Sequence, residues 1–169
     1  MRNKIFLNLL FFSILSYGCS DDDEDGSIEG TWDAADVAFD LRLEGQTISS
    51  WFVNEVGLSQ AQSDGAQSSF EQNFRNDFLG SLTFNEDGSF SSAGNPQPST
   101  GTWQLDDDRL TVTSATPGED AIIFEIGALT SEGLLLEFNQ TVERDLDGNG
   151  TVEELLATID WSFVKRQEL

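Results

Sequence analysis

The 169-residue chain contains no histidine and only one cysteine, Cys19. Without histidine, a Ser-His or Cys-His nucleophilic mechanism and a His-ligated zinc site are excluded. A single cysteine cannot form a disulfide within the chain, so stability must come from an apolar core or from a metal. A mechanism based on two carboxylates, as in glycosidases, stays formally possible. With 31 acidic residues in the chain, however, two neighbouring carboxylates are not evidence of an active site. The sequence therefore predicts a protein that is not an enzyme.

Basic residues are also scarce. Eight Lys and Arg stand against 31 Asp and Glu, which gives a formal net charge of −23. A surface this acidic repels the phosphate backbone of nucleic acids, so we expect no nucleic-acid partner. It also repels an anionic membrane surface, so attachment to a membrane would need a lipid. The length suits one domain of about 100–150 residues with a real core.

Long apolar runs are missing apart from residues 5–15, which follow Arg2 and Lys4. Eleven residues are too few to span a bilayer as a helix and about right for the core of a signal peptide. Gly18 immediately precedes Cys19, an arrangement that resembles the lipobox at which bacterial lipoproteins are cut and acylated. We predict a signal peptide over 1–18 and lipidation of Cys19. The alternative is an ordinary secretory signal with an incidental cysteine.

Five consecutive carboxylates at residues 21–25 follow the predicted anchor. Such a run cannot pack, so residues 19–27 are predicted to form a solvated acidic tether. An acidic cluster directly behind an acylated cysteine resembles the surface-export signal of Bacteroidetes lipoproteins; the alternative is a spacer that keeps the domain off the membrane. Both interpretations predict a lipid-anchored protein of the bacterial outer membrane, and the first predicts exposure at the cell surface.

Alternation of apolar and polar residues predicts about eight short antiparallel strands. The clearest stretch runs from residue 80 to residue 114, where Asp-Gly and Asp-rich turns separate the strands. The predicted strands are 30–43, 80–85, 88–93, 100–106, 109–115, 121–128, 133–143 and 155–166. Eight sequential strands predict an all-β, mostly antiparallel fold over 28–169, namely an up-and-down barrel, because closure removes exposed strand edges. A two-sheet sandwich is the alternative.

A helical insertion is predicted near 47–79. Within residues 47–64, Trp51, Phe52 and Val56 fit one side of a helical turn that ends either at Gly57 or at the Ser-Gln-Ala-Gln stretch 59–62. The polar residues 60–67 are predicted to form a loop. A capping-box pattern at 68–71 then begins an amphipathic helix that ends at Gly80. Its apolar stripe consists of Phe70, Phe74 and Phe78. Such a stripe packs a helix on a sheet, or alternatively plugs the mouth of a barrel.

The order of these motifs resembles the lipocalin-like lipoprotein domains of Bacteroidetes over most of residues 28–166. The resemblance is carried by Cys19, Gly30-Thr31-Trp32, the hairpin at 82–90, the segments 101–105 and 110–112, and the aromatic final strand ending in Lys165. It implies a calyx-like β-barrel that holds a small apolar ligand. The insertion near 47–79 departs from the family pattern, which continues with strands there.

An eight-stranded barrel either encloses one small ligand or is filled by its own side chains. The first case predicts an envelope protein that binds a small hydrophobic molecule or a glycan fragment. The second predicts a non-enzymatic structural or interaction module that meets another envelope protein. The aromatic residues predicted to line a ligand cavity are Trp32, Phe84, Phe90, Trp103 and Trp161.

Residues 145–156 follow the spacing of an EF-hand calcium loop up to its ninth position. Gly150 stands at position six, where the loop turns sharply, but Leu156 replaces the glutamate at position twelve. The predicted calcium ligands are Asp145, Asp147, Asn149, Thr151, Glu153 and Glu154. We expect a structural site that clamps the hairpin between the last two strands. The alternative is an ordinary Asp/Asn/Gly-rich hairpin loop.

Overall fold

The strands close into one antiparallel barrel in the computed structural model, which describes residues 26–94 and 99–167. The predicted signal peptide, Cys19 and most of the tether lie outside the described residues. The strands are β1 (Gly30–Leu43), β2 (Gln46–Thr47), β3 (Gly80–Phe84), β4 (Ser89–Gly94), β5 (Ser99–Asp106), β6 (Arg109–Ser114), β7 (Ile122–Leu129), β8 (Gly133–Arg144) and β9 (Glu153–Lys165). The helical segments are α1 (Ile48–Trp51), η1 (Phe52–Val56) and α2 (Gln60–Asn76).

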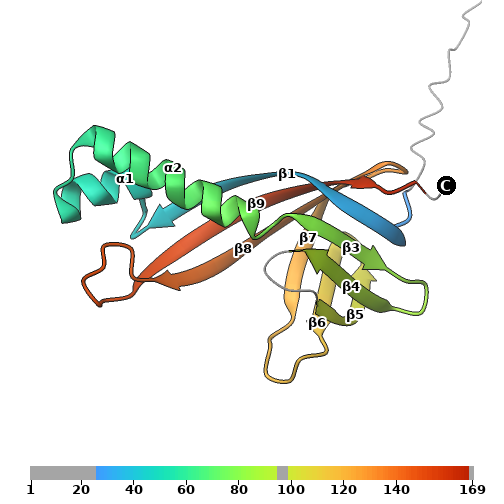
Figure 1. Cartoon of the computed structure of the whole chain (residues 1–169). Helices are drawn as coiled ribbons and strands as arrows, with labels where there is room; N and C mark the ends of the chain where they lie inside the picture. Colours follow the sequence, from blue (N-terminus) through green and yellow to red (C-terminus); the bar gives the residue numbers. More distant parts are fainter. Residues whose placement is uncertain (1–25, 95–98, 168–169) are drawn as a thin grey trace, which may run out of the picture.

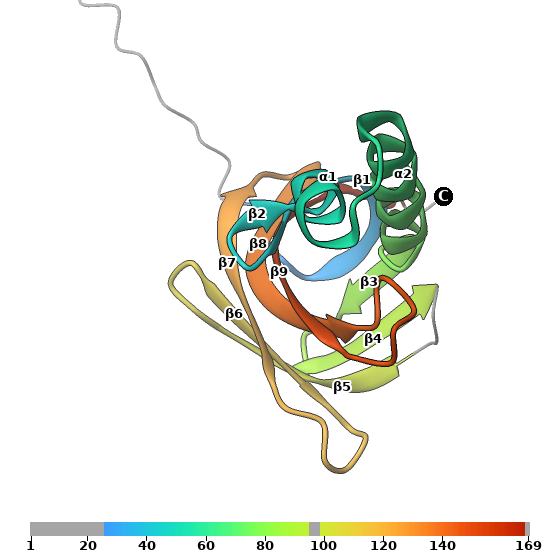
Figure 2. The same ribbon diagram turned by 90° about the vertical axis from the view of Figure 1, so that its left-hand side faces the viewer.

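The barrel has an up-and-down topology. From β3 to β9 each strand pairs with the next one in the chain, β1 pairs with β3, and β9 pairs back with β1 (Figures 1 and 2). Eight strands therefore close the barrel, and the two-residue β2 adds to the far end of β1. The prediction of an eight-stranded antiparallel barrel with a helical insertion is confirmed.

Three strands are longer than the barrel. Only residues 30–33 of β1 pair with β3, whereas β1 pairs with β9 from Trp32 to Leu43. β8 pairs with β9 over its full length. β8, β9 and β1 thus continue beyond the barrel as a three-stranded sheet, and the helices cover one face of it (Figure 1). Alternation places apolar side chains on the covered face. They are Val37, Leu41 and Leu43 of β1 and Leu155, Ala157 and Ile159 of β9, all buried.

The helical insertion begins where the sequence predicts it, but its second helix begins earlier than the capping-box pattern at 68–71 indicates. η1 ends at Val56, and Gly57 follows it in the left-handed conformation with φ 77°. α2 then begins at Gln60, because the side chain of Gln62 accepts the backbone N–H of Ser59 at 3.1 Å in a capping box. The predicted loop at 60–67 is therefore wrong. This first half of α2 has no apolar stripe, so periodicity does not reveal it.

Polar contacts hold the first half of α2 against α1. The backbone N–H of Ser49 donates to the side chain of Gln67 at 2.9 Å, and the Ser49 hydroxyl donates to Asp64 at 2.7 Å. Gln60 donates to the same carboxylate at 2.7 Å. The hydrogen bonds from Ser49 and Gln60 lower the pKa of Asp64. Tertiary hydrogen bonds thus stabilise a helical segment that lacks an apolar face.

α2 ends at Asn76, before the predicted end at Gly80, so Phe78 lies just beyond the helix. The aromatic stripe nevertheless packs on the extended sheet and reaches the barrel. Phe74 meets Phe39 of β1 edge-on, with ring centroids 5.4 Å apart. Phe78 lies edge-on to Trp161 of β9 at 5.3 Å and also contacts Phe138 of β8 at 6.1 Å. The core under the helices is therefore continuous with the interior of the barrel. Among the described residues, no helix has both the length and the apolar character needed to cross a membrane.

The barrel has a closed end, which we define by the turns at 85–88, 107–108 and 130–132. The chain enters here, because a Cβ atom on Gly26 would lie only 2.3 Å from the carbonyl oxygen of Thr130. The chain also leaves here, where Nε of Arg166 donates to Asp33 at 3.0 Å. This hydrogen bond lowers the pKa of Asp33.

Candidate functional site: a barrel cavity and an acidic hairpin loop

A cavity of about 410 Å³ lies in the barrel at the end opposite these turns, which we call the open end. Its lining combines inward-facing apolar side chains, three serines, and two acidic residues from the loop between β6 and β7. The lining residues are Leu82, Phe90, Ser92, Ser99, Val112, Ser114, Glu119, Asp120, Ile122, Phe124 and Trp161. This volume falls within the usual range for small-molecule sites.

Side-chain size along the strands explains why the cavity forms at the open end. Towards the closed end, the inward positions carry Trp32, Phe84 and Leu110, which are fully buried and fill the interior. At the open end, Ser92 and Ser99 face each other across β4 and β5, and their hydroxyls are 2.8 Å apart. Small side chains at inward positions leave space that large ones would occupy. The barrel is therefore filled at one end and hollow at the other.

A smaller cavity of about 210 Å³ lies near the end of α2. Both cavities are lined by Leu82, Ser92, Ser99 and Trp161. The indole Nε1–H of Trp161 is buried and has no hydrogen-bond partner among the described residues. Buried indole N–H groups normally find an acceptor. Because Nε1 is inaccessible to solvent, Trp161 lines the cavity with other atoms of its side chain.

Of the five aromatic residues predicted to bind a ligand, Phe90 and Trp161 line the cavity. Trp32 lies towards the closed end, where its Nε1–H donates to the carbonyl of Ile28 at 2.7 Å. Trp103 is half-buried and donates to a backbone carbonyl in the β3–β4 turn. Phe84 fills the space beside Phe90, with ring centroids 5.7 Å apart. None of these three residues lines the cavity, and Phe84 is the one that packs against its wall.

Sequence reasoning missed the serines and the two acidic residues of the lining. The signal for Ser92 and Ser114 was present in the alternation, because they share a strand face with Phe90 and Val112 respectively. A prediction based on aromatic residues overlooks small inward side chains. The predicted up-and-down strand order places the loop carrying Glu119 at the open end, but nothing in the local sequence indicates that it would line a cavity there.

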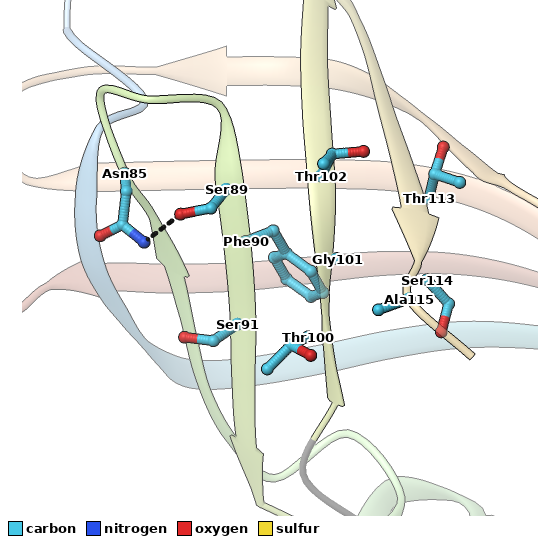
Figure 3. A pocket seen from close by; sticks show the side chains of 10 residues that line it. All are labelled: Asn85, Ser89, Phe90, Ser91, Thr100, Gly101, Thr102, Thr113, Ser114 and Ala115. Atoms are coloured by element: carbon cyan, nitrogen blue, oxygen red, sulfur yellow. Dashed lines mark hydrogen bonds between the residues drawn. The ribbon is translucent and has the colours of Figure 1, made fainter.

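A second depression of about 400 Å³ lies over β4, β5 and β6 (Figure 3). Its lining is rich in hydroxyl groups and includes Ser89, Ser91, Thr100, Thr102 and Thr113. At one side, the amide nitrogen of Asn85 donates to the hydroxyl of Ser89 at 2.8 Å. None of the residues that line it is charged.

The loop at 145–152 is folded by hydrogen bonds from its own backbone. The carboxylate of Asp145 accepts the N–H groups of Gly148 and Gly150 at 2.7 and 2.9 Å. Asn149 accepts the N–H of Thr151 at 2.6 Å. Gly150 has φ 87°, a conformation that favours glycine, at the position where the calcium-loop pattern requires it.

Three carboxylates gather at this loop. Oxygen atoms of Asp145, Asp147 and Glu153 lie within 4.8 Å of one another. Two oxygens bound to one Ca²⁺ at about 2.4 Å each are at most about 4.8 Å apart, so the spacing fits a shared ion. Glu153 also accepts the N–H of Leu146 at 2.7 Å. Glu154 is exposed and, as the next residue of β9, faces the other side of the strand; it lies outside this cluster.

No model of a known protein family matches the sequence, and no curated protein matches it. Among solved structures, the chain is similar to a DUF4847 family protein from Bacteroides vulgatus ATCC 8482, with 14% sequence identity and a TM-score of 0.39. The similarity covers 83% of this chain and 95% of that one. At this distance the likeness carries no function from one chain to the other.

Proposed function

We propose that the protein is a lipid-anchored envelope protein whose lipocalin-like barrel binds a small hydrophobic molecule, with a structural calcium loop between β8 and β9. Acylation of Cys19 would attach it to the outer membrane. The observation that supports binding is the cavity at the open end, walled by Leu82, Phe90, Val112 and Phe124. An apolar ligand would be stabilised in this cavity because its apolar surface is removed from water. The role is binding without catalysis.

The cavity is tested with the purified protein and the apolar dye N-phenylnaphthylamine, whose fluorescence rises in an apolar environment. We expect saturable binding that Ser92→Phe abolishes or weakens at least about tenfold, because the new ring occupies the space beside Ser99. Ser91→Phe is the matched control, since residue 91 faces the other side of β4. If the dye does not bind, or if both variants bind it equally well, the interior is not a ligand site and the filled-core interaction module is favoured.

The loop at 145–152 would bind Ca²⁺ in a structural role. Asp145, Asp147 and Glu153 would supply carboxylate oxygens, and Asn149 and Thr151 would supply carbonyl oxygens. Hard oxygen ligands converging on a glycine-containing loop suit Ca²⁺. A bound ion would offset the clustered negative charge and fix the loop at the end of the extended sheet.

Calcium at ten times its Kd is expected to stabilise the protein by about 1.4 kcal/mol, which raises Tm by about 3–6 °C for a chain of this size. The shift should reverse on chelation and disappear in Asp145→Asn. Asp108→Asn, which removes one charge from the β5–β6 turn instead, should keep it. Differential scanning calorimetry with Ca²⁺, with Mg²⁺ and with a chelator makes the comparison. If calcium raised the Tm of both variants equally, the loop at 145–152 would be an ordinary turn and not a calcium site.

A further inference from the structure

We infer that Asn149 is a site at which the chain deamidates without an enzyme, and that hydrogen bonds within the loop at 145–152 set the rate. The reactive pair is Asn149-Gly150, the only asparagine-glycine pair in the sequence. Both residues are exposed in the hairpin loop between β8 and β9. The inference goes beyond the proposed function, because it requires neither a ligand in the barrel nor a bound ion.

The backbone nitrogen of Gly150 is the nucleophile. Once hydroxide has removed its proton, this nitrogen attacks Cγ of Asn149 and forms a cyclic succinimide. The bond from Cγ to Nδ2 breaks, and the side-chain nitrogen leaves as ammonia with a proton from water. Water then opens the ring at either carbonyl carbon, which gives aspartate or isoaspartate. Glycine at this position has no side chain that would hinder the attack.

Hydrogen bonds in the closed loop oppose this reaction at the nucleophile and at the amide. The N–H of Gly150 donates to the carboxylate of Asp145 at 2.9 Å, and a negative charge beside the N–H disfavours loss of its proton. The side chain of Asn149 is held at both of its polar atoms. Its Oδ1 accepts the N–H of Thr151 at 2.6 Å, and its Nδ2 donates to Asp147 at 2.8 Å. Attack moves Cγ towards Gly150 and strains or breaks these two bonds, so the closed loop reacts slowly.

The loop can open without unfolding the barrel. The hydrogen bonds that hold Asn149 and Gly150 join residues of the same exposed loop, so their release leaves the pairing of β8 with β9 intact. Exposed hydrogen bonds each contribute little net free energy, and surface loops open far more often than a whole domain unfolds. The fraction of time that the loop is open therefore sets the rate of deamidation.

Deamidation adds a negative charge where the closed loop already gathers three carboxylates. Oxygen atoms of Asp145, Asp147 and Glu153 lie within 4.8 Å of one another, and a carboxylate at residue 149 would repel them. Isoaspartate also routes the main chain through Cγ, which lengthens the backbone at the turn. Both products disfavour reclosure of the loop, so the modification is expected to be one-way.

The test is incubation of the purified protein at neutral pH, followed by mass spectrometry of the intact chain and of its peptides. Conversion of an amide to a carboxyl group raises the mass, and electron-transfer fragmentation distinguishes isoaspartate from aspartate. We expect conversion at Asn149 to be at least about tenfold slower in the folded protein than after unfolding in guanidinium. Asn85 lies in an exposed turn but precedes a glutamate, so it should keep its amide over the same period.

Asp145→Ala removes the carboxylate that accepts the N–H of Gly150. In the folded variant, conversion at Asn149 should rise at least about fivefold. Asp87→Ala is the matched control, because Asp87 accepts the backbone N–H of Ser89 at 2.9 Å in the β3–β4 turn, far from this loop in the sequence. It should leave the rate at Asn149 unchanged. Circular dichroism shows whether both variants keep the barrel.

Hydrogen exchange at the Gly150 amide gives an independent readout. Exchange should quicken in Asp145→Ala by a factor similar to that for deamidation, because both reactions need the N–H to be released. Equal deamidation rates in folded and unfolded protein, or an unchanged rate in Asp145→Ala, would overturn the inference. Retention of the Asn149 amide in the unfolded chain would also overturn it.

Added calcium separates this inference from the proposed calcium site. If the loop binds Ca²⁺ as proposed, saturating calcium should slow conversion at Asn149, because the ion stabilises the closed loop. A rate that depends on Asp145 but not on calcium would contradict the calcium site and support the inference. A rate that depends on neither would contradict both.

Discussion

Replacing Trp32 with alanine is expected to lower the free energy of unfolding by about 3–5 kcal/mol, a large part of the 5–15 kcal/mol typical of a domain. The ring of Trp32 is fully buried between β3 and β9 and sits under the ammonium group of Lys165, 5.0 Å from the ring centroid. Its removal leaves a hole at the closed end, in a layer that β1 cannot collapse to fill, because β1 is paired on both sides there.

Urea denaturation followed by circular dichroism measures this loss. Trp32→Phe is the informative companion, since it keeps most of the buried ring and removes the N–H that the carbonyl of Ile28 accepts. It should cost about 1–3 kcal/mol. If Trp32→Ala costs no more than Trp32→Phe, the closed end is not a packed core, and Trp32 would be free to act as a ligand contact instead.

The second large effect is expected for Phe78→Ala. Phe78 lies just beyond the end of α2, and it contacts Trp161 and Phe138 as well as Phe74. We expect a loss of about 3–5 kcal/mol. Since Phe78 fixes the edge of the Trp161 indole, the near-ultraviolet circular dichroism of the native state should also change.

Phe70→Ala is the control from the same stripe. Phe70 is only half-buried and stacks on Phe74 at 5.9 Å between ring centroids, so its removal should cost clearly less than removal of Phe78. Comparable losses for the two variants would show that the helix is held by its whole stripe. A negligible loss for Phe78→Ala would show that α2 is not packed against the barrel as described.

The strands were predictable because their positions depend on local sequence patterns. Alternation in β1 and β9 and the Asp-rich turns between β3 and β6 gave bounds close to those observed, and eight sequential strands require closure to remove their edges. The start of α2 was not predictable from an apolar stripe, because polar contacts from Ser49 hold its first turns. Those contacts depend on the tertiary position of α1.

The lining of the cavity was also only partly predictable from the sequence. Phe90 and Trp161 were identified as aromatic candidates, yet whether an aromatic residue fills a barrel or walls a cavity depends on what stands opposite it. Trp32 faces large neighbours and is packed, whereas Ser92 and Ser99 leave space near Trp161. Inward serines at one end of a barrel are therefore as informative as its tryptophans.

The position of Gly26 shows at which end of the barrel the chain enters. The chain enters at the closed end, and β9, with 13 residues rising about 3.3 Å each, carries the acidic hairpin loop about 40 Å away. If Cys19 is acylated as proposed, the lipid is attached on the side of the closed end, and the cavity and the hairpin loop lie at the other end of the barrel. A ligand would then reach the cavity through the end of the barrel that does not carry the anchor.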